Sequence, residues 1–166
     1  MIRIGFTGTR RGLTGSQQAR LMTLLQGYVS RYLIVELHHG QCIGADEETA
    51  RMAKTLGCRI VSHPPTDRKA ISTFAADEYR TPMPYLQRNH DIVDETKFLI
   101  ATPGEPVEQL RSGTWSTIRY FRQRRGVEPT ILIPMLYEAV EFDFDAPPRL
   151  PKGAENVVID HRLGSL

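Results

Sequence analysis

Short apolar segments alternate along this chain with amphipathic segments, and this alternation limits its fold more than any other feature. The apolar segments have the length of buried strands, whereas the amphipathic segments repeat apolar residues every three or four positions, as helices do. Parallel strands joined by helices form a sheet that is covered on both faces. We therefore predict an α/β fold, a doubly wound Rossmann-like parallel sheet with helices on both faces.

The predicted strands lie at residues 2–6, 33–37, 59–63, 97–101 and 130–133. Numbered in that order, they are expected to form a sheet of order 3-2-1-4-5. The predicted helices lie at residues 15–32, 45–56, 84–94 and 112–125, and Ile71, Phe74 and Ala75 indicate a further helical stretch. Residues 1–166 are expected to form a single Rossmann-like domain. Within it, residues 136–166 would be a C-terminal extension that packs on an edge of the sheet, with edge strands near residues 142–145 and 157–159.

The composition sets limits on location and partners. The chain has 166 residues, a formal net charge of +2 and two cysteines. No apolar run reaches the roughly 20 residues that span a bilayer, and no signal peptide is recognisable, so we expect a cytoplasmic protein without a membrane partner. The small charge disfavours strong binding to duplex DNA. We expect no cofactor and no metal site, because the adjacent His38 and His39 on a strand would point to opposite faces.

The first candidate loop follows the first predicted strand and contains Thr7, Gly8, Thr9 and Arg10. In open parallel sheets, ligands bind beyond the carboxyl ends of the strands. Glycine lets the backbone approach a ligand, hydroxyl groups donate hydrogen bonds, and arginine matches phosphate oxygens. The loop therefore predicts a phosphate contact. A plain connecting turn is the alternative, because the glycine spacing matches neither the dinucleotide fingerprint nor the P-loop.

The second candidate loop starts at Gly40 and leads through Gly44 and Ala45 to Asp46 at the head of a predicted helix. Free N–H groups at a helix start attract anions. Asp46 could hydrogen-bond a ribose hydroxyl or accept a proton, so we predict that ribose or base lies here. The alternative is that Asp46 only caps the helix.

The third candidate loop contains Arg111, Ser112, Gly113 and Thr114 at the head of the last predicted helix. Gly113 permits close approach, the two hydroxyl groups add to the helix N–H groups, and Arg111 adds a positive charge. This combination predicts a phosphate cradle. The alternative is an ordinary serine N-cap beside a surface arginine.

These loops belong to a wider pattern, which consists of Gly5-Phe6-Thr7-Gly8-Thr9-Arg10, His39-Gly40, Gly44-Ala45-Asp46, Pro84-Tyr85-Leu86, Arg88-Asn89 and Arg111-Ser112-Gly113-Thr114-Trp115. On this pattern, residues 2–134 resemble the SLOG superfamily, named from the Smf/DprA and Lonely Guy proteins, and especially its small stand-alone members in bacteria and phages. The resemblance implies a Rossmann-like fold and a nucleotide-derived ligand held by the glycine loops, with Arg88 and Asn89 either reaching the crevice or facing water.

One departure from the enzymatic branch of that superfamily bears on catalysis. Lonely Guy phosphoribohydrolases carry a P-G-G-x-G-T-x-x-E signature, and Thr117 stands here where the glutamate would be. The predicted function is therefore binding of a nucleotide or nucleotide derivative, as in a sensor. The first alternative is a nucleotide N-glycosidase or phosphoribohydrolase-like enzyme that uses Asp46 or Glu47. The second alternative is a DprA-like module that binds single-stranded DNA, which the small net charge disfavours. The chain could also form a homo-oligomer, and the sequence does not decide this.

Overall fold

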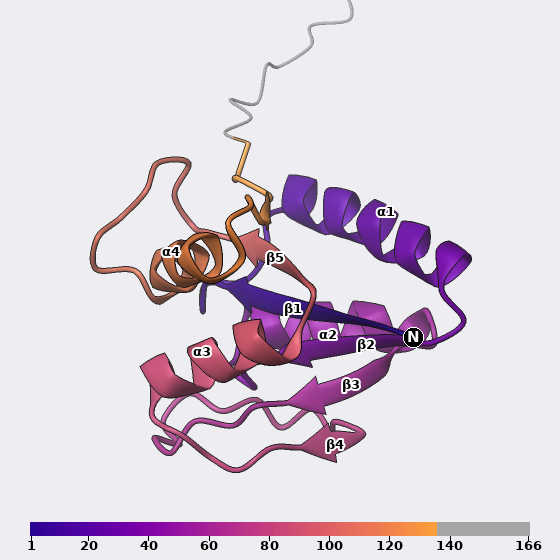
Figure 1. Cartoon of the computed structure of the whole chain (residues 1–166), viewed down its shortest axis with the longest axis horizontal. Coiled ribbons are helices and arrows are strands. Elements are labelled where there is room, and N and C mark those ends of the chain that lie inside the picture. Colours follow the sequence, from indigo (N-terminus) through magenta and orange to yellow (C-terminus); the bar gives the residue numbers. More distant parts are fainter. Residues whose placement is uncertain (136–166) are drawn as a thin grey trace, which may run out of the picture. The chain divides into compact units, whose positions relative to one another are not determined.

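The computed structural model describes residues 1–135, which form a six-stranded parallel sheet with helices on both faces (Figure 1). The strands are β1 (Ile2–Gly8), β2 (Val35–His39), β3 (Arg59–Ser62), β4 (Glu78–Tyr79), β5 (Phe98–Thr102) and β6 (Thr130–Ile131). Their order in the sheet is β4-β3-β2-β1-β5-β6, and each neighbouring pair is parallel. The order predicted for the five segments is confirmed, since they correspond to β1, β2, β3, β5 and β6, and the structure adds β4 at one edge.

The helices are α1 (Gly15–Arg31), α2 (Ala45–Thr55), α3 (Tyr85–Glu95) and α4 (Gly113–Arg125). A capping box starts α1, because the Thr14 hydroxyl accepts from the Gln17 N–H while the Gln17 side chain accepts from the Thr14 N–H. Gly126 ends α4 with a φ of 67°, a left-handed conformation that glycine adopts without strain. None of the helices in residues 1–135 is both long and apolar enough to cross a membrane.

One predicted helix is wrong. The stretch around Ile71, Phe74 and Ala75 is irregular, and Ile71 pairs with Cys42 as an isolated antiparallel bridge. The Ser72 N–H donates to the Gln41 carbonyl, so the backbone hydrogen bonds of this segment go to a neighbouring loop rather than along a helix. Phe74 and Ala76 pack against the main hydrophobic core, and the segment leads into β4.

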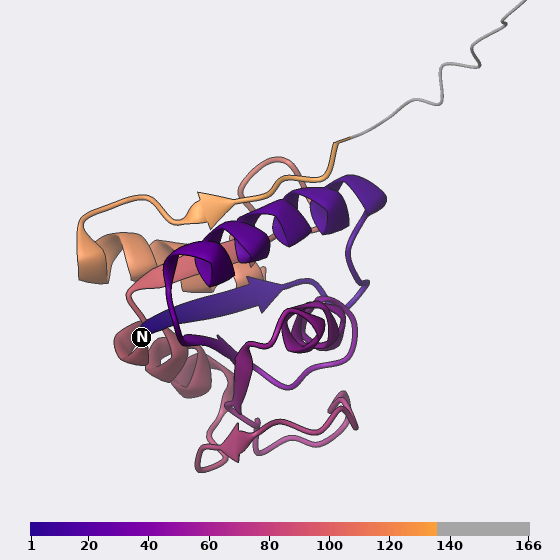
Figure 2. The same cartoon turned by 90° about the vertical axis from the view of Figure 1, so that its right-hand side faces the viewer.

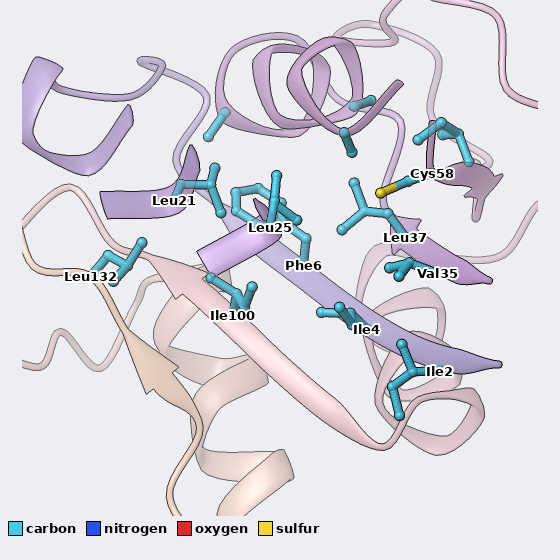
Figure 3. Close-up of a cluster of buried hydrophobic side chains, with 14 residues drawn as sticks. Ile2, Ile4, Phe6, Leu21, Leu25, Val35, Leu37, Cys58, Ile100 and Leu132 are labelled. Carbon is cyan, nitrogen blue, oxygen red and sulfur yellow. The ribbon is translucent and has the colours of Figure 1, made fainter. Parts of the chain in front are cut away.

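One face of the sheet carries the main hydrophobic core beneath α1 and α2. Ile2, Ile4 and Phe6 alternate along β1 toward this face, and Leu21 and Leu25 of α1 are buried against them (Figure 3). Strand residues that alternate in this way share one side of a sheet. Cys58, between α2 and β3, belongs to the same cluster (Figure 3).

The other face packs against α3 and α4 (Figure 1 and Figure 2). Here Gly5 lets α3 approach β1 closely, since a Cβ at this position would lie 2.7 Å from Thr96 Oγ1 and 3.0 Å from Ile92 Cγ2. Farther along the sheet, Leu99 packs with Phe121 and Val93. The predicted extension at residues 136–166, with its two edge strands, lies outside the described residues.

Candidate functional site

A crevice of about 390 Å³ opens beyond the carboxyl ends of β1 and β5, which are neighbours in the sheet as predicted. The segment after β1, the start of α3, the segment after β5 and the start of α4 all contribute side chains. The lining residues are Thr7, Gly8, Thr9, Arg10, Arg11, Cys42, Asp46, Tyr85, Leu86, Arg88, Asn89, Gly104, Glu105, Ser112, Gly113 and Thr114.

Most residues that the sequence singled out meet in this crevice. The first loop, Asp46, Arg88, Asn89 and the segment Ser112 to Thr114 all line it. Gly40, Gly44, Ala45 and Arg111 are not among the lining residues. Arg111 is exposed, one residue before the N-cap of α4.

The start of α4 is available to a ligand. Ser112 is the N-cap, and its hydroxyl accepts from the Trp115 N–H at 3.4 Å. The first N–H groups of a helix have no partner within the helix. Among residues 1–135, the N–H groups of Gly113 and Thr114 have no hydrogen-bond partner. A Cβ on Gly113 would meet nothing within 4 Å, so the space beside this turn is open.

The loop after β1 packs against the start of α2 and closes the space beside Gly44. The Ala45 N–H donates to the Thr9 carbonyl at 3.1 Å, and the Asp46 carboxylate folds back to accept from the Cys42 N–H at 3.1 Å. Gly44 has a φ of 80°, and a Cβ there would lie 2.3 Å from the Arg10 carbonyl oxygen. Gly44 and Ala45 therefore join two loops instead of lining the crevice.

A buried arginine from α3 reaches the inner end of the crevice. Arg88 is 6% exposed. Its guanidinium fills the space where a side chain on Gly40 would begin, because a Cβ built on Gly40 would lie 1.1 Å from Arg88 Nη1. Gly40 thus makes room for Arg88. The guanidinium lies 3.9 Å from the Asp46 carboxylate and donates to Cys42 Sγ at 3.5 Å, while its Nε has no partner among the described residues.

The crevice carries a positive electrostatic bias. Arg10, Arg11 and Arg88 line it together with only two carboxylates, Asp46 and Glu105. Burial raises the pKa of Asp46, although the nearby Arg88 opposes this shift. The Tyr85 ring lies beneath two of the cations, 4.9 Å from the Arg10 guanidinium and 5.6 Å from that of Arg88.

An ion pair joins the segment after β1 to the segment after β5. The Arg11 guanidinium pairs with Glu105, and both side chains are well exposed. The guanidinium also packs against Gly104, because a Cβ built on Gly104 would lie 2.2 Å from Arg11 Nη2. Arg11 therefore lies across the outer part of the crevice and connects its two walls.

Sequence reasoning had not assigned Arg11, Cys42, Tyr85, Leu86, Gly104 and Glu105 to the site. Arg11 and Cys42 lie within candidate loops, and Tyr85 and Leu86 precede Arg88 by one helical turn or less. That spacing places them on the same end of α3, which is a usable signal. Glu105 carries no comparable signal, because nothing in its local pattern indicates the ion pair with Arg11.

Thr117, which replaces the glutamate of the enzymatic signature, and Glu47, the second carboxylate considered for catalysis, lie outside the crevice. The Thr117 hydroxyl donates to the Gly113 carbonyl at 2.9 Å, and the residue is buried within α4. Glu47 pairs with Arg51 on the outside of α2 at 2.6 Å and does not line the crevice. Asp46 and Glu105 are therefore the only carboxylates lining the crevice in residues 1–135.

No model of a known protein family matches the chain, and no curated protein is similar to it in sequence. Solved structures do match. A molybdenum cofactor binding protein from the phototrophic bacterium Rippkaea orientalis has a TM-score of 0.61 at 20% identity, over 81% of this chain and 78% of that one. DNA processing protein A from Helicobacter pylori, described for its single-stranded DNA binding mode, has a TM-score of 0.55 at 16% identity, over 82% and 67%.

TM1055, a structural-genomics target, has a TM-score of 0.56 at 15% identity, over 78% of this chain and 77% of that one. At these identities the matches concern the fold. The chain has the Rossmann-like α/β fold of these three proteins, and this is the fold that the resemblance of its loops to the SLOG superfamily implies.

Proposed function

We propose that the crevice binds a nucleotide or another phosphate-bearing small molecule, with phosphate between the Gly8–Arg10 segment and the first turn of α4. The observation that carries this proposal is the open start of α4, where Gly113 and Thr114 line the same crevice as Arg10. Unpaired N–H groups and the aligned peptide dipoles attract anions to such a helix start. The volume lies in the range of about 300–1,000 Å³ that is usual for small-molecule sites.

The inner part of the crevice suits the remainder of a nucleotide. Tyr85 offers an aromatic ring, Asn89 offers an amide, and Asp46 offers an acceptor for a hydroxyl group. The unpartnered Nε of Arg88 adds a buried donor. A ligand with phosphate at one end and polar ring atoms at the other would therefore meet matching groups along its length, in a protein that we expect to act in the cytoplasm.

The test is native mass spectrometry of the purified chain, followed by calorimetry with nucleoside monophosphates, nucleoside diphosphates and inorganic phosphate. Arg10→Ala should remove a charge-assisted contact worth about 1.5–3 kcal/mol, which lowers affinity about ten- to hundredfold. Arg111→Ala is the matched control, because it removes the same charge from an exposed position outside the crevice. Equal affinities for wild type and Arg10→Ala would place the phosphate elsewhere.

The salt dependence of affinity distinguishes a single-stranded DNA ligand from a mononucleotide. If the crevice instead served single-stranded DNA, an oligothymidine would bind, and its affinity would fall steeply with salt because several phosphates would be contacted at once. A mononucleotide would lose affinity only modestly over the same range. Tight, steeply salt-dependent binding of the oligonucleotide without binding of mononucleotides would overturn the proposal.

A second candidate function is hydrolysis of a nucleotide at its N-glycosidic bond. The observation that favours it is the position of Asp46, which is buried, lines the crevice and has a raised pKa because of that burial. Breaking this bond develops positive charge on the ribose, which a carboxylate stabilises. Release of free base at about 1 per second, lost in Asp46→Asn, would support hydrolysis over binding alone.

A further inference from the structure

A second cluster of chemically active side chains lies away from the crevice, where β2, β3 and the end of α3 meet. His38 in β2 and His63 directly after β3 are both almost fully buried, and Glu95 is the last residue of α3. His38 Nδ1 lies 3.0 Å from His63 Nε2 and 3.8 Å from Glu95 Oε2. One donor atom from each side chain falls within 4.8 Å of the others.

This donor set is one that zinc-type ions prefer. Two imidazole nitrogens and one carboxylate form the protein ligands of many zinc sites that keep a fourth position for water. Two nitrogens on one tetrahedral ion, each about 2.0–2.1 Å from it, stand about 3.3 Å apart. The observed separation of 3.0 Å needs only a small adjustment to reach that spacing.

A buried carboxylate lies on the side of His38 that faces away from the cluster. Its other nitrogen, Nε2, is buried without a hydrogen-bond partner among the described residues, and the Glu36 carboxylate is 3.6 Å from it. A carboxylate behind a histidine keeps the proton on that far nitrogen and leaves the near nitrogen's lone pair for a metal. Glu36 is itself buried and held by Arg3 at 2.9 Å and Arg59 at 3.0 Å.

The charges around the cluster are balanced. Arg80 contacts the cluster from one side, since it pairs with Glu95 Oε2 at 2.7 Å and with Glu78.

We propose that His38 Nδ1, His63 Nε2 and the Glu95 carboxylate bind a divalent transition-metal ion of the zinc type. The ion would join β2, β3 and α3, three elements that are far apart in the sequence. Its ligands come from neighbouring strands and a helix rather than from the adjacent pair His38 and His39. The proposal is independent of the crevice and of any ligand bound there.

The test uses the full chain, stripped with a chelator and titrated with Zn²⁺ and with Co²⁺. We expect one ion per chain, a rise in melting temperature with Zn²⁺, and the visible absorption of tetrahedral Co²⁺. His63→Gln and Glu95→Gln should each weaken Zn²⁺ binding at least about tenfold. His90→Gln is the control, because this histidine stacks on Tyr120 outside the cluster and should bind Zn²⁺ as wild type does.

The test remains decisive even if His63→Gln, which changes a buried residue, fails to fold. Glu95 is partly exposed, so Glu95→Gln is the safer substitution. X-ray absorption of the Zn²⁺-loaded wild type should also show two imidazole nitrogens near 2.0 Å. Binding that is equal in wild type, Glu95→Gln and His90→Gln, or a spectrum without histidine, would overturn the proposal and leave a hydrogen-bonded histidine pair.

Discussion

The starts of α2 and α4 lie at the same edge of the sheet, and each follows a loop that contains glycine. At α2, the Ala45 N–H donates to the Thr9 carbonyl, and the Arg10 backbone packs against Gly44. At α4, Ser112 caps the Trp115 N–H, and nothing lies within 4 Å of a Cβ built on Gly113. A glycine beside a helix start therefore does not by itself mark an anion site. What matters is whether another part of the fold already occupies the space beside the helix start.

The two glycines at these helix starts should respond differently to the same substitution. Gly44→Ala places a Cβ 2.3 Å from a backbone oxygen in a left-handed conformation, and we expect it to lower the free energy of unfolding by about 3 kcal/mol. Gly113→Ala is the matched control. It meets open space in a helical position and should leave stability unchanged or raise it by up to about 1 kcal/mol.

Urea unfolding followed by circular dichroism measures both changes. Because the Cβ of Gly113→Ala enters the crevice wall, this variant should also weaken nucleotide binding while its fold stays intact. Equal stability losses in the two variants would contradict the distinction between a closed and an open helix start.

Removing the N-cap of α4 tests the open start directly. Ser112→Ala should lower the free energy of unfolding by about 1 kcal/mol, because the Trp115 N–H loses its acceptor. It should also reduce phosphate affinity, since the cap hydroxyl lines the crevice. Ser116→Ala is a suitable control, because this serine lies in α4, does not line the crevice, and its hydroxyl makes no hydrogen bond within residues 1–135. A Ser112→Ala variant as stable as Ser116→Ala would show that the cap contributes nothing.

The pH dependence of anion binding tests the role of Asp46 at the start of α2. The raised pKa of Asp46 means that its carboxyl takes up a proton at a higher pH than an ordinary aspartate does. As the pH falls through that pKa, a negative charge beside Arg88 disappears, so anion affinity should rise about two- to fivefold. By linkage, the same group stabilises the fold at low pH and loses that contribution as the pH rises.

Asp46→Asn is the control for this prediction. A nucleotide phosphate titrates near pH 6 by itself, and the variant reports that contribution alone. Calorimetry of both proteins between about pH 5 and about pH 8 then isolates Asp46 by difference. Identical pH profiles would mean that Asp46 stays ionised or lies too far from the phosphate.

The smallest effect is expected at the ion pair that spans the crevice. Glu105→Gln breaks the pair with Arg11 at an exposed position, where such pairs contribute less than about 1 kcal/mol. The free energy of unfolding should therefore barely change. Nucleotide affinity should rise slightly at low salt, because Arg11 is released to face the ligand. A clear loss of stability would show that the pair holds the segment after β5 in place.

Much of the fold could be predicted because its signals are local and periodic. The apolar spacing predicts the four helices and the five strands other than β4, and short right-handed connections between parallel strands predict their order. The edge strand β4 was missed because Glu78 and Tyr79 belong to no apolar run. The helix expected at Ile71 failed because apolar spacing over so few residues fits several conformations.

The candidate site was predictable in outline and not in detail. The loops after parallel strands meet at one edge, so Gly8 and Ser112 could be assigned to one crevice from sequence alone. The use of the Ala45 N–H by Thr9 depends on a contact between two loops that no local pattern records. The pairing of His38 with His63 likewise depends on strand register, since β2 and β3 align His39 with Ser62.

The two cysteines give the molecule a pair of built-in chemical reporters. Cys42 lines the crevice beside Arg88, whereas Cys58 belongs to the core beneath α2. Burial raises the pKa of both thiols, so a labelling reagent reacts slowly with either while the protein stays folded. A bound ligand would slow the labelling of Cys42 directly by covering it, whereas it would slow the labelling of Cys58 only through the added stability of the fold. One alkylation time course, in which the modified peptides are quantified separately, thus distinguishes occupancy of the crevice from local unfolding of the core.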